Sequence, residues 1–88
     1  MKVSPNEIRK TLRTLSNSRA FPATFCPSEV ARDLADDWRP LMPAIRREAA
    51  KLIAAGELEC LQGGAPVEIE KAVGPIRLRA AKATSPSG

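Results

Sequence analysis

The segment from Pro43 to Arg79 constrains the fold of this chain more than any other. Apolar residues recur at helical spacing over Leu41–Leu52, and the prolines nearby place the start of a regular helix near Pro43. Gly56 follows as a left-handed C-cap. Two stretches, 57–61 and 76–79, then alternate as strands do, with Gly and Pro turn signals between them. The segment therefore predicts a helix, then two strands joined by a long loop.

The first half of the chain predicts two more helices. Ser4 and Glu7 have the spacing of a capping box, and the helix they begin ends near 16–18. The second begins at Cys26–Glu29 and runs for at most about three turns. Phe21 and Phe25 fall at the edges of the link between them, and a single turn over Trp38–Leu41 precedes the third helix. The predicted core comprises Ile8, Leu12, Leu15, Val30, Leu34, Ile45, Leu52, Leu58, Ile76 and Leu78, with Cys60 also inward.

This order of elements predicts an α+β fold of the winged helix-turn-helix type. Three helices are followed by a two-stranded β-hairpin with a long wing loop, over residues 1–80. Residues 81–88 carry no periodicity and are expected to form a disordered tail. Winged-helix domains commonly bind either nucleic acid or a partner protein. The predicted architecture is therefore compatible with both functions.

Composition and charge indicate a small cytoplasmic domain. The chain has 88 residues, a net charge of +4 and a pI near 9.6, which is compatible with binding a polyanion. We find neither a signal-peptide pattern at the N-terminus nor an apolar run of the ~20 residues that a membrane helix needs. We therefore expect reduced thiols at Cys26 and Cys60.

Three segments resemble a family of short bacterial proteins known as domain of unknown function three-two-five-three. The segments are Thr24–Arg32, Trp38–Met42 and Gly74–Arg79. The resemblance extends from about Ile8 to Arg79. It implies a winged-helix fold and a bacterial cytoplasmic setting, and it implies no substrate.

The third helix carries the candidate nucleic-acid site, because this helix usually enters the major groove in such folds. Its face opposite Ile45 holds Arg47 and Lys51, with Arg46 at the flank. These side chains suit phosphate contacts, and an arginine also suits a guanine edge. Arg9, Lys10 and Arg13 on the first helix, predicted opposite its apolar face, are expected to support binding to duplex DNA. Arg77 and Arg79 form a further basic pair on the last strand.

Other features favour a protein partner or a second copy of the chain. The predicted wing carries Glu68, Glu70 and Lys71, a net charge of −1 that phosphates would repel. The third helix opens with apolar residues, and Ala50 and Ala54 leave a flat face suited to close packing. An adaptor or a homodimer is therefore the alternative to a DNA-binding, possibly transcriptional, module.

Catalysis is not expected from this composition. The chain has no histidine, no tyrosine and no glycine-rich phosphate loop, and its cysteines lack metal-ligand spacing. We therefore expect no enzyme activity, no cofactor, no metal and no small-molecule substrate. Trp38 is interpreted as packing at the turn between the second and third helices, or as an exposed anchor for a partner protein.

Overall fold

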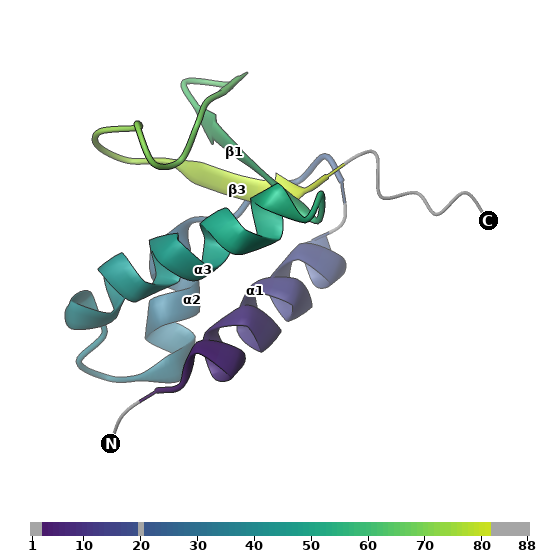
Figure 1. Ribbon diagram of the computed structural model, residues 1–88. Helices are drawn as coiled ribbons and strands as arrows, with labels where there is room; N and C mark the ends of the chain where they lie inside the picture. The colour runs from purple at the N-terminus through teal and green to yellow at the C-terminus, as the bar shows by residue number, and fades with distance from the viewer. Residues whose placement is uncertain (1–2, 20, 82–88) are drawn as a thin grey trace.

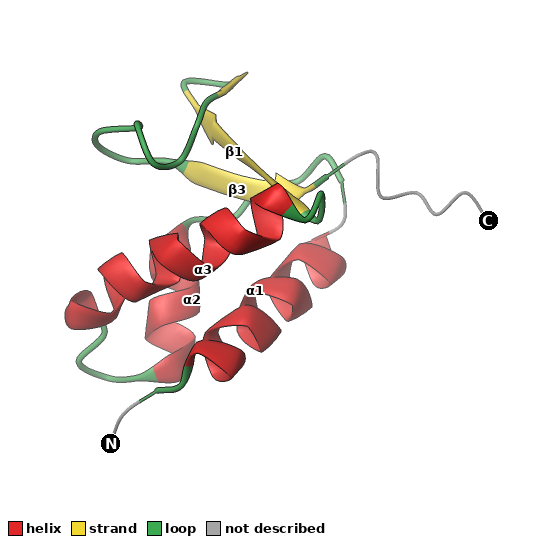
Figure 2. Ribbon diagram, in the orientation of Figure 1, coloured by secondary structure: helices red, strands yellow, loops and turns green. Residues whose placement is uncertain are grey.

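The computed structural model describes residues 3–19 and 21–81 and shows an α+β fold (Figure 1). Three helices are followed by a small antiparallel sheet, which lies above α3 in the coloured ribbon of Figure 2. The helical elements are α1 (Pro5–Arg19), α2 (Pro27–Leu34), the 3-10 helix η1 (Arg39–Leu41) and α3 (Met42–Ala54). The strands are β1 (Leu58–Gln62), β2 (Ala65–Pro66) and β3 (Arg77–Ala80).

The predicted starts of the first two helices are confirmed by local hydrogen bonds, whereas α1 continues to Arg19, past the end predicted near 16–18. The Ser4 N–H donates to Glu7 Oε1 at 3.0 Å, and the Glu7 N–H donates to Ser4 Oγ at 3.2 Å. At α2, the Cys26 N–H donates to the carboxylate of Glu29 at 2.9 Å. The single turn predicted before the third helix is η1, and Gly56 beyond α3 has a φ of 80°. These signals act within one or two turns, so the sequence predicts them well.

The sheet has three strands, not the two that the sequence predicts. Gly63 and Gly64 have φ values of 62° and 84°, as a two-residue turn with left-handed backbone requires. The turn returns the chain along β1, so that Leu61 lies opposite Pro66 and Gln62 opposite Ala65. Strand order is β2-β1-β3, and the long loop predicted between two strands shortens to the segment 67–76. We refer to this segment as the 67–76 loop.

The core joins α1, α2 and α3 to one face of the sheet. Leu15 and Leu34, predicted to be core residues, are only partly buried, while the other predicted members are buried. Phe25 is fully buried although the sequence places it at the edge of a link. Its backbone exchanges two hydrogen bonds of 2.8 Å with Leu78, which ties the link to the sheet. The buried hydrophobic residues that the prediction missed include Phe25, Ala31, Ala49, Leu61 and Ile69.

The buried part of the fold includes Ala81. Ala81 was predicted to belong to the tail, but it is buried and its N–H donates to the Glu57 carbonyl oxygen at 3.1 Å. The rest of the predicted tail, 82–88, lies outside the described residues. Within the described ranges, no helix has both the length and the apolar character needed to cross a membrane.

Candidate nucleic-acid interface

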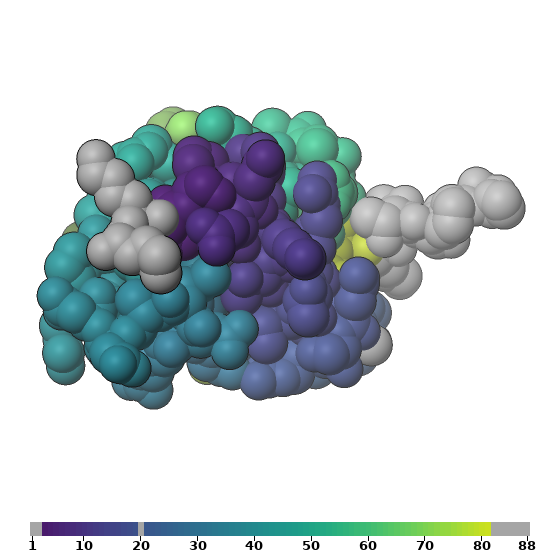
Figure 3. Space-filling view, turned by 90° about the horizontal axis from the view of Figure 1, so that it is seen from below, coloured from purple at the N-terminus to yellow at the C-terminus, as the bar shows by residue number. Residues whose placement is uncertain are grey.

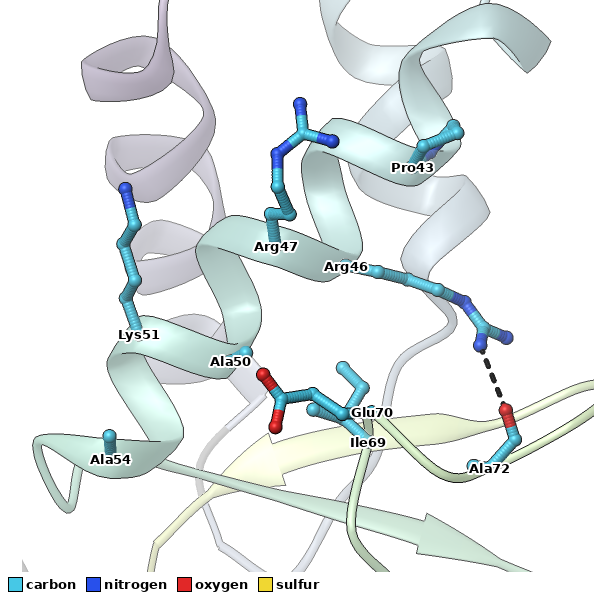
Figure 4. A pocket seen from close by; sticks show the side chains of 9 residues that line it. All are labelled: Pro43, Arg46, Arg47, Ala50, Lys51, Ala54, Ile69, Glu70 and Ala72. Atoms are coloured by element: carbon cyan, nitrogen blue, oxygen red, sulfur yellow. Dashed lines mark hydrogen bonds between the residues drawn. The ribbon is translucent and has the colours of Figure 1, made fainter.

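The outward face of α3 and the 67–76 loop enclose a hollow of about 650 Å³ (Figure 4). Small apolar residues form much of its lining. Its charged members are Arg46, Arg47 and Lys51 from α3 and Glu70 from the loop. Figure 4 shows Glu70 turned towards Ala50 of α3. The three cations that the sequence analysis placed on α3 therefore line one hollow, opposed by one carboxylate.

Arg46 is engaged in holding the 67–76 loop. Its guanidinium donates to the carbonyl oxygens of Ala72 at 3.3 Å and Gly74 at 2.8 Å, and Figure 4 shows it extended towards Ala72. Gln62 Nε2 donates to the two remaining carbonyl oxygens of the segment 72–75, at 2.8 and 3.1 Å. Four successive carbonyl groups are thus held by two side chains. Arg46 is positioned to order the loop, and its guanidinium is only partly available to a ligand.

Arg47 and Lys51 extend from α3 on the side away from the loop (Figure 4). They are one helical turn apart and both exposed. Within residues 3–19 and 21–81, the Arg47 side chain has no hydrogen bond and no acidic partner. Lys51 Nζ lies 3.2 Å from an oxygen of Glu48 on the same helix. Arg47 therefore offers the more available charge of the two.

Glu48 links α3 to the basic residues of α1. Its carboxylate accepts from Arg9 at 2.5 Å and from Lys51, and its side chain is only 5% exposed. Arg9 thus lies at the contact between α1 and α3. The prediction that it lies opposite the apolar face of α1 is wrong. Further along α1, Arg13 makes two hydrogen bonds to the Glu57 carboxylate, at 2.8 and 3.1 Å. Two of the three α1 residues predicted to support DNA binding therefore meet acids of this chain beside α3.

Another ion pair joins Arg19 to Glu29 at 2.5 Å. The ion pairs lower the pKa of Glu29, Glu48 and Glu57 below the ordinary value of 4.5. Burial is the largest single influence on the pKa of Glu48 and raises it, but the hydrogen bonds and charges of Arg9 and Lys51 together outweigh it. The hydrogen bond from Arg13 is the main cause of the lowered pKa of Glu57. The hydrogen bond from Arg19, then that from the Cys26 N–H, lowers the pKa of Glu29.

The remaining basic residues lie elsewhere. Lys10 is exposed and lines a hollow between α1 and α2, together with Asp33. Figure 3 shows this helical side of the molecule, with α1 in purple beside the blue and teal surface of the segments that follow. Arg77 donates to Thr24, and Arg79 donates to Glu59 at 2.6 Å. Lys10 and the arginines of β3 are therefore not among the residues that line the α3 hollow.

Sequence reasoning missed a pair of exposed arginines around Trp38. The Arg32 and Arg39 guanidinium carbons lie 4.9 and 4.7 Å from the centroid of the Trp38 ring. Trp38 itself packs against the core at the turn between α2 and α3, as predicted. Arg39 precedes Pro43 by one helical turn. This spacing is the sequence signal by which Arg39 could have been grouped with Arg46, Arg47 and Lys51.

The fold and this surface define a small α+β domain with a basic outer helix and no assigned chemistry. The chain belongs to the family described as "Protein of unknown function (DUF3253)", whose model matches residues 5–81. The matched range includes every helix and strand described above. No curated protein matches the sequence.

Proposed function

We propose that this protein is a nucleic-acid-binding module of the winged-helix type, acting as a transcriptional accessory that contacts duplex DNA through α3. The observation that carries this proposal is the outward face of α3, where Arg46, Arg47 and Lys51 line one hollow whose single acidic lining residue is Glu70. In a helix-turn-helix, the corresponding helix enters the major groove. Exposed cations at that position suit phosphate contacts, which supply most non-specific affinity.

The order of the elements supports the winged-helix interpretation. α2 and α3 are joined by a short connection containing η1, and the sheet follows α3 directly. Arg46 has an indirect part in this proposal, because it holds the 67–76 loop beside the helix. Arg9 and Arg13 contribute less than the sequence suggested, since Glu48 and Glu57 already neutralise much of their charge. The role proposed here is binding, not catalysis.

The acidic residues of the 67–76 loop limit how the domain would dock. Glu68 pairs with Lys71 at 3.5 Å, and Glu70 faces the hollow. A loop with this charge is poorly suited to follow a phosphate backbone. The proposal therefore places DNA against the side of α3 from which Arg47 and Lys51 extend.

Duplex DNA binding at low salt should be measurable, and it should weaken as salt increases. We expect a log–log slope of about −0.9 for each phosphate contacted, because binding releases counterions. Replacing both Arg47 and Lys51 by Gln is expected to make the slope shallower by roughly 1.8. Fluorescence anisotropy of a labelled duplex measures both quantities. Lys71→Gln, on the loop, is the matched control and should leave the slope unchanged; absence of binding by the wild type would contradict the proposal.

A second candidate function is an adaptor or dimer built on the same hollow. Ala50, Ala54 and Ile69 form an apolar lining there, and Val73 of the adjoining loop is 88% exposed. Exposed apolar surface beside small residues on a helix is typical of protein interfaces. In a dimer formed through this hollow, Glu70 of one copy and Lys51 of the other carry opposite charges and would attract each other.

Analytical ultracentrifugation at micromolar concentration distinguishes this candidate from the first. If the hollow is a dimer interface, Ala50→Glu should shift the dimer towards monomer, because a charge replaces a small apolar contact. Lys10→Glu, on α1, is the control that changes charge without touching the hollow. A wild-type protein that already sediments as a monomer at these concentrations, with salt-sensitive DNA binding unchanged in Ala50→Glu, would exclude the dimer.

A further inference from the structure

Most arginines in residues 3–19 and 21–81 are bound by other groups of the chain. Six donate side-chain hydrogen bonds to carboxylate, hydroxyl or carbonyl oxygens, namely Arg9, Arg13, Arg19, Arg46, Arg77 and Arg79. Three have no such acceptor within these residues, namely Arg32, Arg39 and Arg47. All three belong to the continuous segment formed by α2, η1 and α3. The uncompensated guanidinium groups are thus concentrated on the helix-turn-helix.

Arg32 and Arg39 are held in place although they have no hydrogen-bond acceptor among the described residues. Both stack on Trp38, at 4.9 and 4.7 Å from the ring centroid, and Trp38 packs against the core. A cation on an indole ring is attracted to it by about 0.5–1 kcal/mol at an exposed site. The stacking leaves the N–H groups at the edges of each guanidinium free to donate. Two exposed arginines with reduced rotational freedom are well prepared to bind phosphate oxygens.

The segment from Arg32 to Arg39 carries two arginines against three aspartates, a net charge of −1, so anion binding at this turn depends on the arginines and the aspartates facing different sides of it. Asp33 and Asp37 line hollows on the α1 side of the turn. Asp36 is exposed and is the remaining acid of this turn. η1 runs directly into α3, so Arg39 lies about one helical turn before Pro43, at the N-terminal end of the face that carries Arg47. The cluster therefore continues the basic face of α3 towards α2.

We propose that Arg32 and Arg39, stacked on Trp38, form a phosphate-binding clamp that fixes the DNA backbone at the turn between α2 and α3. This inference rests on the DNA-binding role proposed above and assigns to it two contacts outside the α3 hollow. The ligand group is the phosphodiester of duplex DNA. Contacts of this kind position a helix-turn-helix on the duplex and leave sequence readout to α3.

Trp38 provides a local readout, because it is the only tryptophan and the chain has no tyrosine. Titration with a short DNA duplex should change Trp38 emission in the wild type, since phosphates bound at the edges of the two guanidinium groups alter the electrostatic environment of the ring. The combined variant Arg32→Gln with Arg39→Gln should make the salt slope shallower by about 1.8, corresponding to two lost phosphate contacts. Thermal unfolding of the variant checks that the fold is retained.

Two further variants separate charge from stacking. Replacing both arginines by Lys keeps the charge, so the salt slope should be retained, whereas affinity should fall because lysine lacks the planar group that stacks. Arg77→Gln, on β3, removes an exposed cation elsewhere and should leave both slope and Trp38 emission response unchanged. DNA binding with a wild-type slope in the Arg32→Gln, Arg39→Gln variant would overturn the clamp and leave the α3 proposal standing. Absence of any binding by the wild-type protein would overturn both.

Discussion

Phe25→Ala is expected to reduce the free energy of unfolding by about 3–5 kcal/mol, the usual cost of removing a buried phenylalanine. Phe25 is fully buried, and its ring is among the largest side chains of the core. Its backbone is also paired with Leu78 of β3, so the surrounding chain has little freedom to close the cavity. Folded domains of this size are stable by roughly 5–15 kcal/mol, so the loss is a large share of the total. Urea unfolding followed by circular dichroism measures it.

Phe21→Ala is the matched control for this experiment. Phe21 is 40% exposed and lies against the guanidinium of Arg79, with the ring centroid 4.8 Å away. Its removal should cost far less than that of Phe25, because the ring already contacts solvent. Equal losses for the two variants would show that Phe25 does not occupy the core position described here.

Glu48→Ala is expected to lower the free energy of unfolding by about 3 kcal/mol, near the lower end of the values for breaking a buried ion pair. The carboxylate is 5% exposed and accepts hydrogen bonds from Arg9 on α1 and Lys51 on α3. Removal leaves the Arg9 guanidinium without its acceptor at the contact between the two helices. Because 27% of the Arg9 side chain is exposed, water can solvate part of it, which limits the loss. Urea unfolding at pH 7 provides the measurement.

The stabilisation that Glu48 provides should decrease as the pH falls. The pKa of Glu48 in the folded protein lies below its ordinary value of 4.5, so its contribution is fully present above that value. The contribution of Glu48 to the free energy of unfolding is lost as pH falls through the lowered pKa. The difference in this free energy between wild type and Glu48→Gln should therefore become smaller in that pH range. Glu57→Ala, at the more exposed pair with Arg13, is the control and should cost less than Glu48→Ala. A pH-independent difference for Glu48→Gln would contradict the ion-pair role.

Much of the fold follows from local signals in the sequence. The capping residues Ser4 and Glu7, the prolines before α3 and the glycine at 56 act on backbone conformation within a few residues. Their effects are the same whatever lies elsewhere in the chain, so α1, α2, α3 and the last strand could be predicted. The two-residue turn at 63–64 is also a local feature, but the sequence pattern predicts its glycines to begin a longer loop.

The candidate site depended more on contacts between distant segments. The sequence identified Arg46, Arg47 and Lys51 from helical spacing, and the structure places them around one hollow. It did not predict that Arg46 holds the 67–76 loop, which lies more than twenty residues further along the chain. Hydrogen bonds of this kind are determined by how α3 and the sheet pack, and no local pattern encodes their geometry.

The order of the elements, the apolar faces of the helices and the net positive charge can be read from the amino-acid sequence alone. Those properties depend on neighbouring residues and on composition. The burial of Phe25, the pairing of Glu48 with Arg9 and the contact of two arginines with Trp38 become known from the folded structure. Burial and pairing depend on which surfaces meet when the chain folds. Phe21 is partly exposed and Phe25 is fully buried, although both are phenylalanine. Packing between segments, and not residue type, therefore determines which of the two enters the core.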